Sequence, residues 1–486
     1  MNPRIISRSE HTVSRKWISH NAVRVLYKLK ERGYHAYLVG GGVRDLLLGR
    51  EPKDFDIATN ARPNEIKKIF HNCRLIGRRF RLAHIHFHDE IIEVATFRSN
   101  ITEDLEVKVK AGISEPQPPL KGEPVPVAQA APEAPVRPRP PRMLKTEDGM
   151  ILRDNVFGTP EQDAIRRDFT VNALFYNIAD FSVIDYVGGM ADLRQGLIRL
   201  IGDPATRFTE DPVRMVRAVR FAAILGFEFE ENTYRALLEL RDKVALASPA
   251  RMYEEVLKLF LLGEGEKTYQ LLRKTGLFGV IFPRLNEWVD TEADGFPHTW
   301  VGKALEWVDA CVQAGRKVEP HILFGLMFGQ YIEEKAAEHR TAGAAALEAV
   351  TRAVAEALSD QARLVQIPKK VGLPMRDMYW NQQRFEKREG KNPRYFLRRP
   401  GFADAFEYLR FSSETTGERM GLRAWWRKFI KAHPPGPGEE KELQKNAERK
   451  ARPKRRRRRG GKGRQEGGKA GKEVAELKPR TPNSKP

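Results

Sequence analysis

Twenty residues between Leu38 and Ile57 constrain this 486-residue chain more than any other stretch. Their sequence, LVGGGVRDLLLGREPKDFDI, predicts a strand at 34–39, a glycine turn, a short helix at 43–48 and a second strand at 53–58. Three consecutive glycines let the backbone turn sharply and bring its amide groups close to an anion. The stretch therefore indicates a small α/β layer with a turn suited to a phosphate group.

Two carboxylates, Asp54 and Asp56, stand two residues apart on the second of these strands. Side chains at i and i+2 share one face of a strand, so we expect both carboxylates to point the same way and Phe55 and Ile57 to face the core. Such a pair repels unless a hard cation lies between its members. With a phosphate-binding turn nearby, the pair indicates phosphoryl or nucleotidyl transfer that depends on Mg²⁺ or Mn²⁺. An isolated pair of this kind is more often a solvated strand edge, so the assignment depends on the motifs that follow.

The remaining pattern changes from mixed to helical along the chain. Other elements expected before residue 205 are helices at 17–31 and 62–70 and strands at 85–87, 91–97, 170–177 and 182–185. From Asp211 to about residue 360, apolar residues recur at helical spacing, and a basic helical region is expected at 363–431. The predicted fold class is therefore α+β, with the strands in the first part of the chain.

Two segments are not expected to pack a core. Residues 111–142 contain ten prolines and predict a flexible, extended insert. Residues 434–486 carry 18 Lys and Arg against 7 Asp and Glu, with six consecutive cations at 454–459. This tail holds about half of the net charge of +21, which indicates a polyanionic partner, either nucleic acid or an anionic membrane surface.

Composition excludes several classes of protein. Two cysteines, Cys73 and Cys311, are too few for a disulfide framework or a zinc cluster, which agrees with a reducing compartment. No apolar run approaches the ~20 residues that cross a bilayer, and the first 30 residues lack the apolar stretch of a secretory signal. We expect a cytoplasmic protein without a transmembrane segment, and leave open peripheral association with a membrane through the basic tail.

Four segments together resemble the class II nucleotidyltransferases, the family of tRNA CCA-adding enzymes and bacterial poly(A) polymerases. They are the stretch at 38–57, RRDFTVNALFY at 166–176, DYVGGMADLRQGLIRLIGDP at 185–204 and EDPVRMVRAVRFAAILGF at 210–227. The resemblance covers about residues 15–431 without the proline-rich insert. It implies a polymerase-β-like nucleotidyltransferase head with a small mixed β-sheet, followed by an all-α remainder.

The resemblance also implies a division of the chain into parts. These are a nucleotidyltransferase head at 15–205 containing the insert at 111–142, a helical nucleotide-selecting neck at 206–270, a helical body at 271–362, an arginine-rich RNA-binding domain at 363–431 and a disordered basic tail at 434–486.

Individual roles follow from the matched motifs. Asp54 and Asp56 would hold the metal ions and carry catalysis. Two candidates for a third carboxylate stay open: Asp168 matches a position treated as catalytic in bacterial poly(A) polymerases, whereas Glu93 lies on a strand with good geometry for facing Asp54 and Asp56. The resemblance assigns nucleotide binding to Gly40, Gly41, Arg44, Arg167, Asp211, Arg214 and Arg217.

Asp211 and Arg214 are three residues apart on an expected helix and would project from one face. In the family this pair reads the base, because an acceptor beside a fork of donors matches the amino group and ring nitrogen of adenine. An alternative is a capping carboxylate in an ordinary ion pair, since Glu210-Asp211-Pro212 is typical of a helix start. The two roles are compatible.

Two regions favour poly(A) addition over CCA addition. LIGRRFRLAHIHF at 75–87 resembles a segment that marks bacterial poly(A) polymerases, and 363–431 resembles their arginine-rich domain. In the second region cations alternate with aromatic residues, a pattern typical of RNA-binding surfaces. Alternatively, the aromatic residues form the core of a small helical domain; we expect most of them in that core and most cations facing RNA. Candidate RNA-binding residues are Arg376, Arg384, Arg388, Arg394 and Arg398.

The sequence thus predicts an enzyme that uses ATP to polyadenylate RNA 3′ ends without a template, releases pyrophosphate and marks the RNA for decay. Its expected partners are RNA 3′ ends and ATP, with RNA-decay proteins as further candidates. The alternatives are a tRNA CCA-adding enzyme and, in another class, a catalytically inactive RNA-binding adaptor. The intact carboxylate pair argues against the adaptor.

Overall fold

A computed structural model of the chain describes residues 2–77, 82–99, 143–145, 151–154, 157–293, 296–297 and 299–434. The predicted insert at 111–142, part of the segment at 75–87 and all but the first residue of the predicted tail at 434–486 lie outside the described residues. The chain divides into compact units at residues 1–430 and 431–486. The finer domain boundaries expected from the sequence stay predictions.

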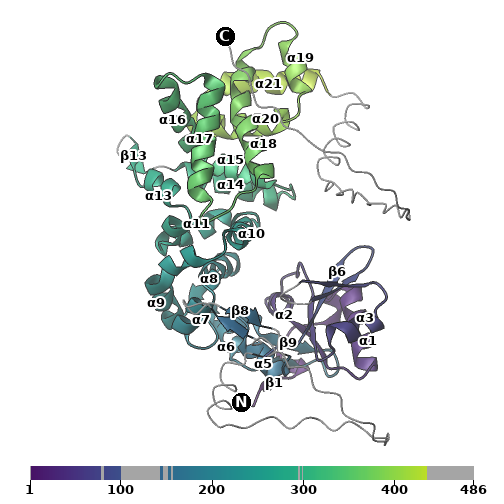
Figure 1. Ribbon diagram of the computed structural model, residues 1–486. Coiled ribbons are helices and arrows are strands. Elements are labelled where there is room, and N and C mark those ends of the chain that lie inside the picture. Colours follow the sequence, from purple (N-terminus) through teal and green to yellow (C-terminus); the bar gives the residue numbers. More distant parts are fainter. Residues whose placement is uncertain are drawn as a thin grey trace, which may run out of the picture. The chain divides into compact units, whose positions relative to one another are not determined.

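An eight-stranded mixed sheet forms the core of the first part of the chain (Figure 1). Its strand order is β1-β10-β9-β2-β3-β6-β5-β4. Within this sheet β3 and β6 are parallel, and the other neighbours are antiparallel. The strands are β1 (Arg4–Ile6), β2 (Ala36–Val39), β3 (Asp56–Thr59), β4 (Cys73–Ile76), β5 (Leu82–His86), β6 (Ile91–Thr96), β9 (Leu174–Asn177) and β10 (Val183–Asp185). Because β9 pairs with β2, segments on both sides of the predicted insert build one sheet.

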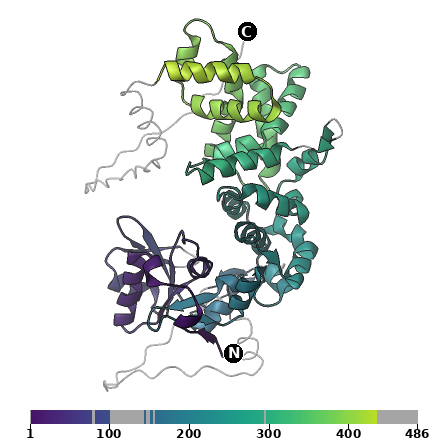
Figure 2. The ribbon, with the colours of Figure 1, turned by 180° about the vertical axis from the view of Figure 1, so that it is seen from behind.

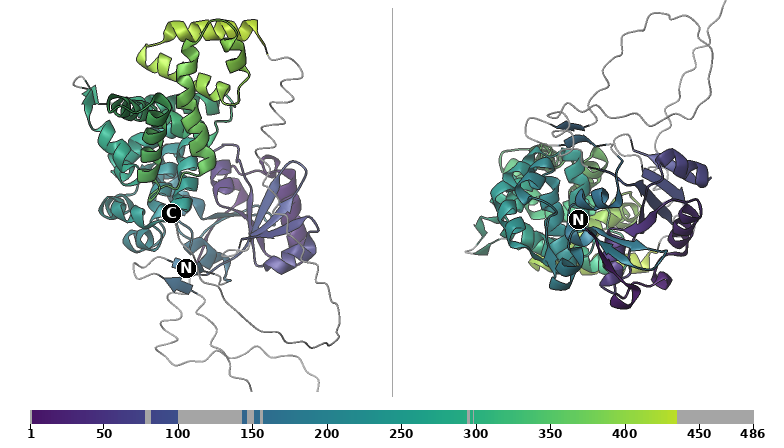
Figure 3. Two further views of the ribbon diagram at one scale, coloured as in Figure 1. Left: turned by 45° about the horizontal axis from the view of Figure 1, so that its top comes forward. Right: turned by 90° about the horizontal axis from the view of Figure 1, so that it is seen from below.

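Helices α1 and α3 pack against strands of this sheet (Figure 1), and the chain beyond residue 204 is mainly helical (Figure 3). The helices are α1 (His20–Glu31), α2 (Gly41–Leu47), α3 (Pro63–Ile69), α5 (Pro160–Ile165), α6 (Gly189–Gln195), α7 (Pro204–Glu210), α8 (Val213–Leu225), α9 (Glu231–Leu240), α10 (Pro249–Phe260), α11 (Gly265–Lys274), α12 (Leu277–Ile281), α13 (Pro283–Val289), α14 (Trp300–Gln313), α15 (Pro320–Met327), α16 (Gly329–Thr341), α17 (Ala346–Gln361), α18 (Lys369–Trp380), α19 (Asn392–Leu397), α20 (Phe402–Thr416) and α21 (Met420–Ala432).

Short elements complete the described residues. They are the two-residue strands β11 (Leu197–Ile198), β12 (Glu228–Phe229), β13 (Glu292–Ala293) and β14 (Phe296–Pro297), the strands β7 (Met143–Lys145) and β8 (Ile151–Asp154), and the 3₁₀ turns η1 (Arg8–Glu10), η2 (Arg15–Trp17), η3 (Thr170–Asn172), η4 (Arg241–Leu246) and η5 (Asn381–Glu386). In the part of the chain that the structure describes, no helix has both the length and the apolar character to cross a lipid bilayer.

Two apolar cores matter for function. One continuous cluster extends from Ile6 to Phe411 and joins the sheet to most of the helices. A second cluster, centred on Phe385, Phe396 and Trp426, ties together η5, α19, α20 and α21; α20 and α21 lie side by side (Figure 2). A mixed sheet followed by helices confirms the predicted α+β fold class.

The strand predicted at 53–58 is wrong at its start, because β3 begins at Asp56. Its partner β2 ends at Val39, which lies opposite Asp56, and Gly40 then turns the chain into α2 with φ of 74°. Residues 53–55 therefore have no β2 residue to pair with. Asp54 precedes the strand, so the argument that both carboxylates share one strand face does not hold.

Two predicted helix starts also change. The helix expected at 17–31 begins only at His20, because the Ser19 hydroxyl accepts a hydrogen bond from the Ala22 N–H at 3.0 Å and caps it. By contrast, α2 begins earlier than expected, at Gly41, so two of the three glycines belong to the helix and only Gly40 forms the turn.

Candidate active site

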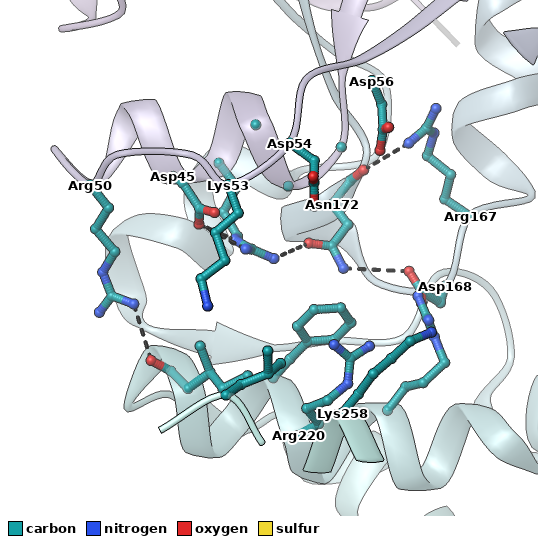
Figure 4. Close-up of a pocket in the computed structure, with 18 of the residues that line it drawn as sticks. Asp45, Arg50, Lys53, Asp54, Asp56, Arg167, Asp168, Asn172, Arg220 and Lys258 are labelled. Atoms are coloured by element: carbon teal, nitrogen blue, oxygen red, sulfur yellow. Dashed lines mark hydrogen bonds and ion pairs between the residues drawn. The ribbon is translucent and has the colours of Figure 1, made fainter. Parts of the chain in front are cut away.

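A cleft of about 920 Å³ collects nearly all of the predicted catalytic and nucleotide-binding residues. Its lining includes Gly40, Gly41, Arg44, Asp54, Asp56, Arg167, Asp168, Asp211, Arg214 and Arg217. In Figure 4, Asp54 and Asp56 lie on one wall, Arg167 lies beside Asp56, and Arg220 and Lys258 lie on the opposite wall. The predicted residues come from the turn before α2 and α2 itself, from the start of β3 and the loop before it, from the segment after α5, and from α8 and the turn before it. Glu93 is not part of this lining.

The turn at Gly40 positions the wall that carries the carboxylates. Its φ of 74° lies in the left-handed region that side chains disfavour. A Cβ atom at Gly40 would lie 3.3 Å from Arg167 Nη1 and 3.9 Å from Asp56 Oδ2. Glycine therefore allows both the backbone conformation and the close approach of a cation and a carboxylate.

The two carboxylates of the D-x-D pair are open to a ligand. Both residues are exposed to the cleft, and no described residue donates a hydrogen bond or forms a salt bridge to either carboxylate. Although Asp56 is open to the cleft, the surrounding protein removes much of the water around its carboxyl and raises its pKa to about 6, and the negative charge of Glu93 raises it further than Asp54 does. Asp56 lies directly opposite Glu93 in the parallel pair of β3 and β6. This local excess of negative charge favours a bound cation.

The two candidates for the third carboxylate differ in their surroundings. Glu93 is half-exposed, and one of its oxygens lies 3.1 Å from His84 Nε2. Asp168 has both oxygens engaged: Oδ2 accepts from Arg217 Nε at 2.8 Å, and Oδ1 accepts from the Phe169 N–H at 2.9 Å. Although burial acts in the opposite direction, the Arg217 guanidinium lowers the pKa of Asp168 to about 2. These contacts favour Glu93 as a metal ligand and Asp168 as the anchor of Arg217.

A cluster of guanidinium groups surrounds one aromatic ring in the cleft. The Cζ atoms of Arg44 and Arg217 each lie 5.4 Å from the centre of the Phe221 ring, and that of Arg220 lies at 4.5 Å. Burial and the neighbouring Arg217 lower the pKa of Arg220 to about 10. Like charges held this close repel, so the cluster is suited to an anion with several charges.

One buried carboxylate, Glu255 on α10, offsets part of this repulsion. Glu255 is 5% exposed. Its oxygens lie 3.7 Å from Arg220, 4.0 Å from Arg217 and 3.0 Å from Lys258. It therefore couples α10 to the cationic face of α8.

The predicted helical pair of Asp211 and Arg214 does not form. Asp211 is extended, with φ of −149°, because a residue before proline is pushed out of the helical region; α8 begins only at Val213. Asp211 instead accepts two hydrogen bonds from Arg251, at 2.8 and 2.7 Å, and a third, of 3.3 Å, from the Val213 N–H. The capping alternative does not hold either, because the N-cap residue of α8 is Pro212, without a side-chain cap, and Asp211 forms its ion pair with Arg251.

Arg214 is held separately from Asp211. Its Nη1 donates to the Arg207 carbonyl at 2.7 Å and lies 3.5 Å from Glu210. Both Asp211 and Arg214 nevertheless line the cleft, so the two side chains face the same space without pairing with each other.

The sequence reasoning missed five lining or supporting residues: Asn172, Arg220, Phe221, Arg251 and Glu255. Asn172 Oδ1 accepts from Arg44 at 2.7 Å. Spacing could have found Arg220, because Arg214, Arg217 and Arg220 recur every three residues along α8. No local pattern points to Arg251 or Glu255, which reach the site through the packing of α10 against α8.

Family models match three parts of this chain: the poly A polymerase head domain at 36–199, the probable RNA and SrmB-binding site of polymerase A at 226–289, and the polymerase A arginine-rich C-terminus at 342–462. The poly(A) polymerase I of Salmonella typhimurium is 42% identical over 434 residues, which are 89% of this chain and 86% of that protein. The chain belongs to the poly(A) polymerase family. The predicted membership is therefore confirmed.

CCA-adding enzymes are less similar to this chain in sequence than the poly(A) polymerases are, but a solved CCA-adding enzyme shares its fold. The CCA-adding enzyme of Lactobacillus gasseri is 32% identical over 285 residues, which are 56% of this chain and 61% of that protein. A solved CCA-adding enzyme without ligand matches with a TM-score of 0.55 at 19% identity, over 89% of this chain and 88% of that one. The match confirms the nucleotidyltransferase fold that the motifs predicted.

Whether a divalent metal fits this member of the poly(A) polymerase family can be judged from its donor atoms. The described residues contain no gathered set of three or more His, Cys, Asp or Glu side chains. They do offer the free carboxylates of Asp54 and Asp56, with Glu93 on the adjacent strand. Mg²⁺ is commonly held by one or two carboxylates, with water and substrate phosphates completing its ligands. The donor set fits that pattern.

The predicted RNA-binding arginines lie away from the cleft lining, in α18, η5, α19 and adjoining turns. Arg376 donates to its neighbour Asp377, whereas Arg388, Arg394 and Arg398 are exposed. The aromatic residues of this part divide as expected. Tyr379, Phe385 and Phe396 are buried, Trp380 is half-buried and Tyr395 is exposed.

The raised pKa of Asp56 predicts how the metal-free protein responds to pH. Because the native pKa of about 6 exceeds the value of about 3.9 in an unfolded chain, the ionised carboxylate destabilises the native state, and stability falls as pH rises from about 4 to about 6. In EDTA, we expect Asp56→Asn to melt at a higher temperature than wild type at pH 8, with a smaller difference at pH 4. Mg²⁺ should raise the melting temperature of the wild type more than that of the variant. An equal difference at both pH values would contradict this account.

Two substitutions separate the candidates for the third carboxylate. Glu93→Gln should lower kcat about a hundredfold or more without changing the melting temperature, because Glu93 is half-exposed. Asp168→Asn should cost about 3–5 kcal/mol of stability, because it leaves Arg217 without its main partner. Steady-state kinetics and thermal denaturation of both variants check this. Full activity of the Glu93→Gln variant would exclude Glu93 as a metal ligand.

Proposed function

We propose that this chain is a template-independent polymerase that transfers AMP from ATP to RNA 3′ ends and releases pyrophosphate. The observation that carries the proposal is the cleft in which two unpartnered carboxylates face a cluster of arginines. Membership of the poly(A) polymerase family supports it. In this reaction the 3′-oxygen forms a bond to the α-phosphate while the bond to the β-phosphate oxygen breaks.

The cationic residues would bind and orient the triphosphate. Arg44 is buried beneath the cleft and held by Asn172 and Asp45, so its guanidinium needs little rearrangement to meet a phosphate. Arg167, beside Gly40, lies close enough to Asp56 to reduce its pKa. Asp54 and Asp56 would hold a divalent metal, with Glu93 on the neighbouring strand as the candidate third carboxylate; the chemistry that such an ion supplies is activation of a hydroxyl group and neutralisation of charge on a leaving pyrophosphate. The arginines share the second of these tasks.

Base selection would use Asp211 and Arg214 without a pair between them. Arg251 fixes the orientation of the Asp211 carboxylate through two hydrogen bonds. Each carboxylate oxygen has two lone pairs, so the group can still accept from the amino group of adenine. Arg214, anchored through Nη1, keeps other N–H groups for the ring nitrogen of the base.

Addition of CCA to tRNA is the second candidate, and the identity with the Lactobacillus gasseri enzyme favours it. The inactive-adaptor alternative is opposed by the intact Asp54 and Asp56. We further propose that the added tails mark RNA for decay, that decay proteins are partners and that the enzyme works in the cytoplasm, with the basic tail attached to RNA or to an anionic membrane surface.

Replacing the metal-binding carboxylate tests the activity. Asp54→Ala should lose at least about 10³-fold of AMP transfer onto an unstructured RNA, while its affinity for that RNA stays within about twofold, because Asp54 is exposed and has no structural partner. The wild type should extend the same RNA into long A-tails in ATP. If addition stops after CCA on a tRNA substrate, the protein is a CCA-adding enzyme and the proposal of polyadenylation is wrong.

Replacing Arg214 tests base selection. Arg214→Ala should relax the preference for ATP over CTP, GTP and UTP, seen as a fall in the ratio of kcat/KM values by about tenfold or more, because the base edge loses a charged donor. Each nucleotide is supplied separately with Mg²⁺. Arg235→Ala, which removes an exposed arginine outside the cleft, should keep the wild-type preference.

A further inference from the structure

The surface above the second apolar core carries an aromatic side chain that takes no part in packing. Tyr395 on α19 is 66% exposed, the highest exposure of any large apolar or aromatic residue in the described part of the chain. Its neighbours in sequence and space, Phe385, Phe396 and Phe402, are buried in that core. The core is therefore complete without the Tyr395 ring, and the ring is free to contact a ligand.

Exposed cations flank Tyr395 along the chain. Lys391 lies one helical turn before Tyr395, and Arg399 follows the C-terminal end of α19, where its N–H donates to the Phe396 carbonyl. The Tyr395 N–H donates to the Lys391 carbonyl at 3.2 Å, which confirms that the helical spacing begins at Lys391. Both cationic side chains are exposed. The exposed ring thus stands between two exposed cations in the chain.

Arg384 on η5 brings another guanidinium group near Arg399. Arg384 on η5 is close enough to Arg399 that this neighbour, together with burial, lowers the pKa of Arg384. Its Cζ atom lies 6.0 Å from the centre of the Trp380 ring, and its Nε is buried without a hydrogen-bond partner. Within the described residues, none of Arg384, Lys391 and Arg399 pairs with a carboxylate.

Neighbouring cations without carboxylate partners repel one another, and an external anion would relieve that repulsion. A phosphate group suits two neighbouring guanidinium groups, because each offers a fork of donors. A free aromatic face beside a phosphate site is the arrangement that binds single-stranded nucleic acid, since every base can stack on it. An acidic protein would match the charges but would not use the ring.

We propose that Arg384, Tyr395 and Arg399 form a subsite for single-stranded RNA, in which Tyr395 stacks on one base and the two guanidinium groups bind an adjacent phosphate. The proposal rests on the proposed function, because it gives the polymerase a contact with the RNA outside the cleft where the 3′ end reacts. The subsite reads no base edge, so it accepts the A-tail and other unstructured sequences alike.

Binding of the full-length protein to fluorescein-labelled 15-nucleotide oligo(A) tests the subsite by fluorescence anisotropy. Tyr395→Ala should raise the Kd at least about fivefold, as expected for one lost base stack, whereas Tyr395→Phe keeps the ring and should match wild type. On a 15-residue abasic RNA backbone, wild type and Tyr395→Ala should bind alike. Because Tyr395 and Arg399 are exposed, the variants should melt at the wild-type temperature.

Salt dependence tests the phosphate contact. Arg399→Ala should weaken binding to both oligo(A) and the abasic backbone, and should reduce the slope of log K against log salt by about 0.7, the value for one phosphate contact on a single strand. Arg32→Ala, which removes an exposed arginine elsewhere, should leave the slope unchanged. Arg32→Ala should also keep the wild-type turnover of ATP.

Two results would overturn the subsite. One is an unchanged affinity of Tyr395→Ala for oligo(A), which would leave this surface to a partner of another class, such as an acidic protein. The other is an equal loss of affinity for oligo(A) and for the abasic backbone, which would exclude stacking. Neither result affects the proposed function, which fails if the wild-type protein does not extend RNA into A-tails or stops after CCA on a tRNA.

Discussion

The conformation of Gly40 is the constraint on which the wall of the cleft that carries Asp54 and Asp56 depends. Its positive φ ends β2 at Val39 and starts α2 at the next residue. That ending leaves Asp54 outside β3 and puts Asp56 at the first paired position, opposite Glu93 on β6. The missing side chain of Gly40 also leaves room for Arg167 beside Asp56. One backbone angle therefore places a turn, two carboxylates and a cation around the same point.

Charge balance organises the opposite side of the cleft. Arg44, Arg217 and Arg220 surround Phe221, and such a cluster would be costly without compensation. Asp168 and Glu255 supply that compensation from two other elements, the segment after α5 and helix α10. Their partial neutralisation leaves enough positive charge for a triphosphate and keeps the arginines ordered before it binds. Asp168 is then better explained as part of this support than as a metal ligand.

The C-terminal helical part shows how one alternating pattern serves two purposes. Phe385, Phe396 and Trp426 fill a small core of their own, while the cations between the aromatic positions stay outside. Tyr395 is the exception, because its position on α19 faces away from that core. Apolar packing inside, with cations and one exposed ring outside, is an arrangement that suits binding of a polyanion without recognition of its sequence.

The sequence by itself determined the fold class and the family, and it marked many of the residues that line the cleft. Glycines, paired carboxylates and recurrent arginines are local signals, and the residues they mark do line one cleft. Only the tertiary structure decided which of these residues touch. Asp211 pairs with Arg251, forty residues away, and Arg217 pairs with Asp168. The register of β3 and β6 places Glu93 directly opposite Asp56. Such contacts depend on how helices and strands pack, and a one-dimensional spacing rule carries no information about partners that lie on different elements.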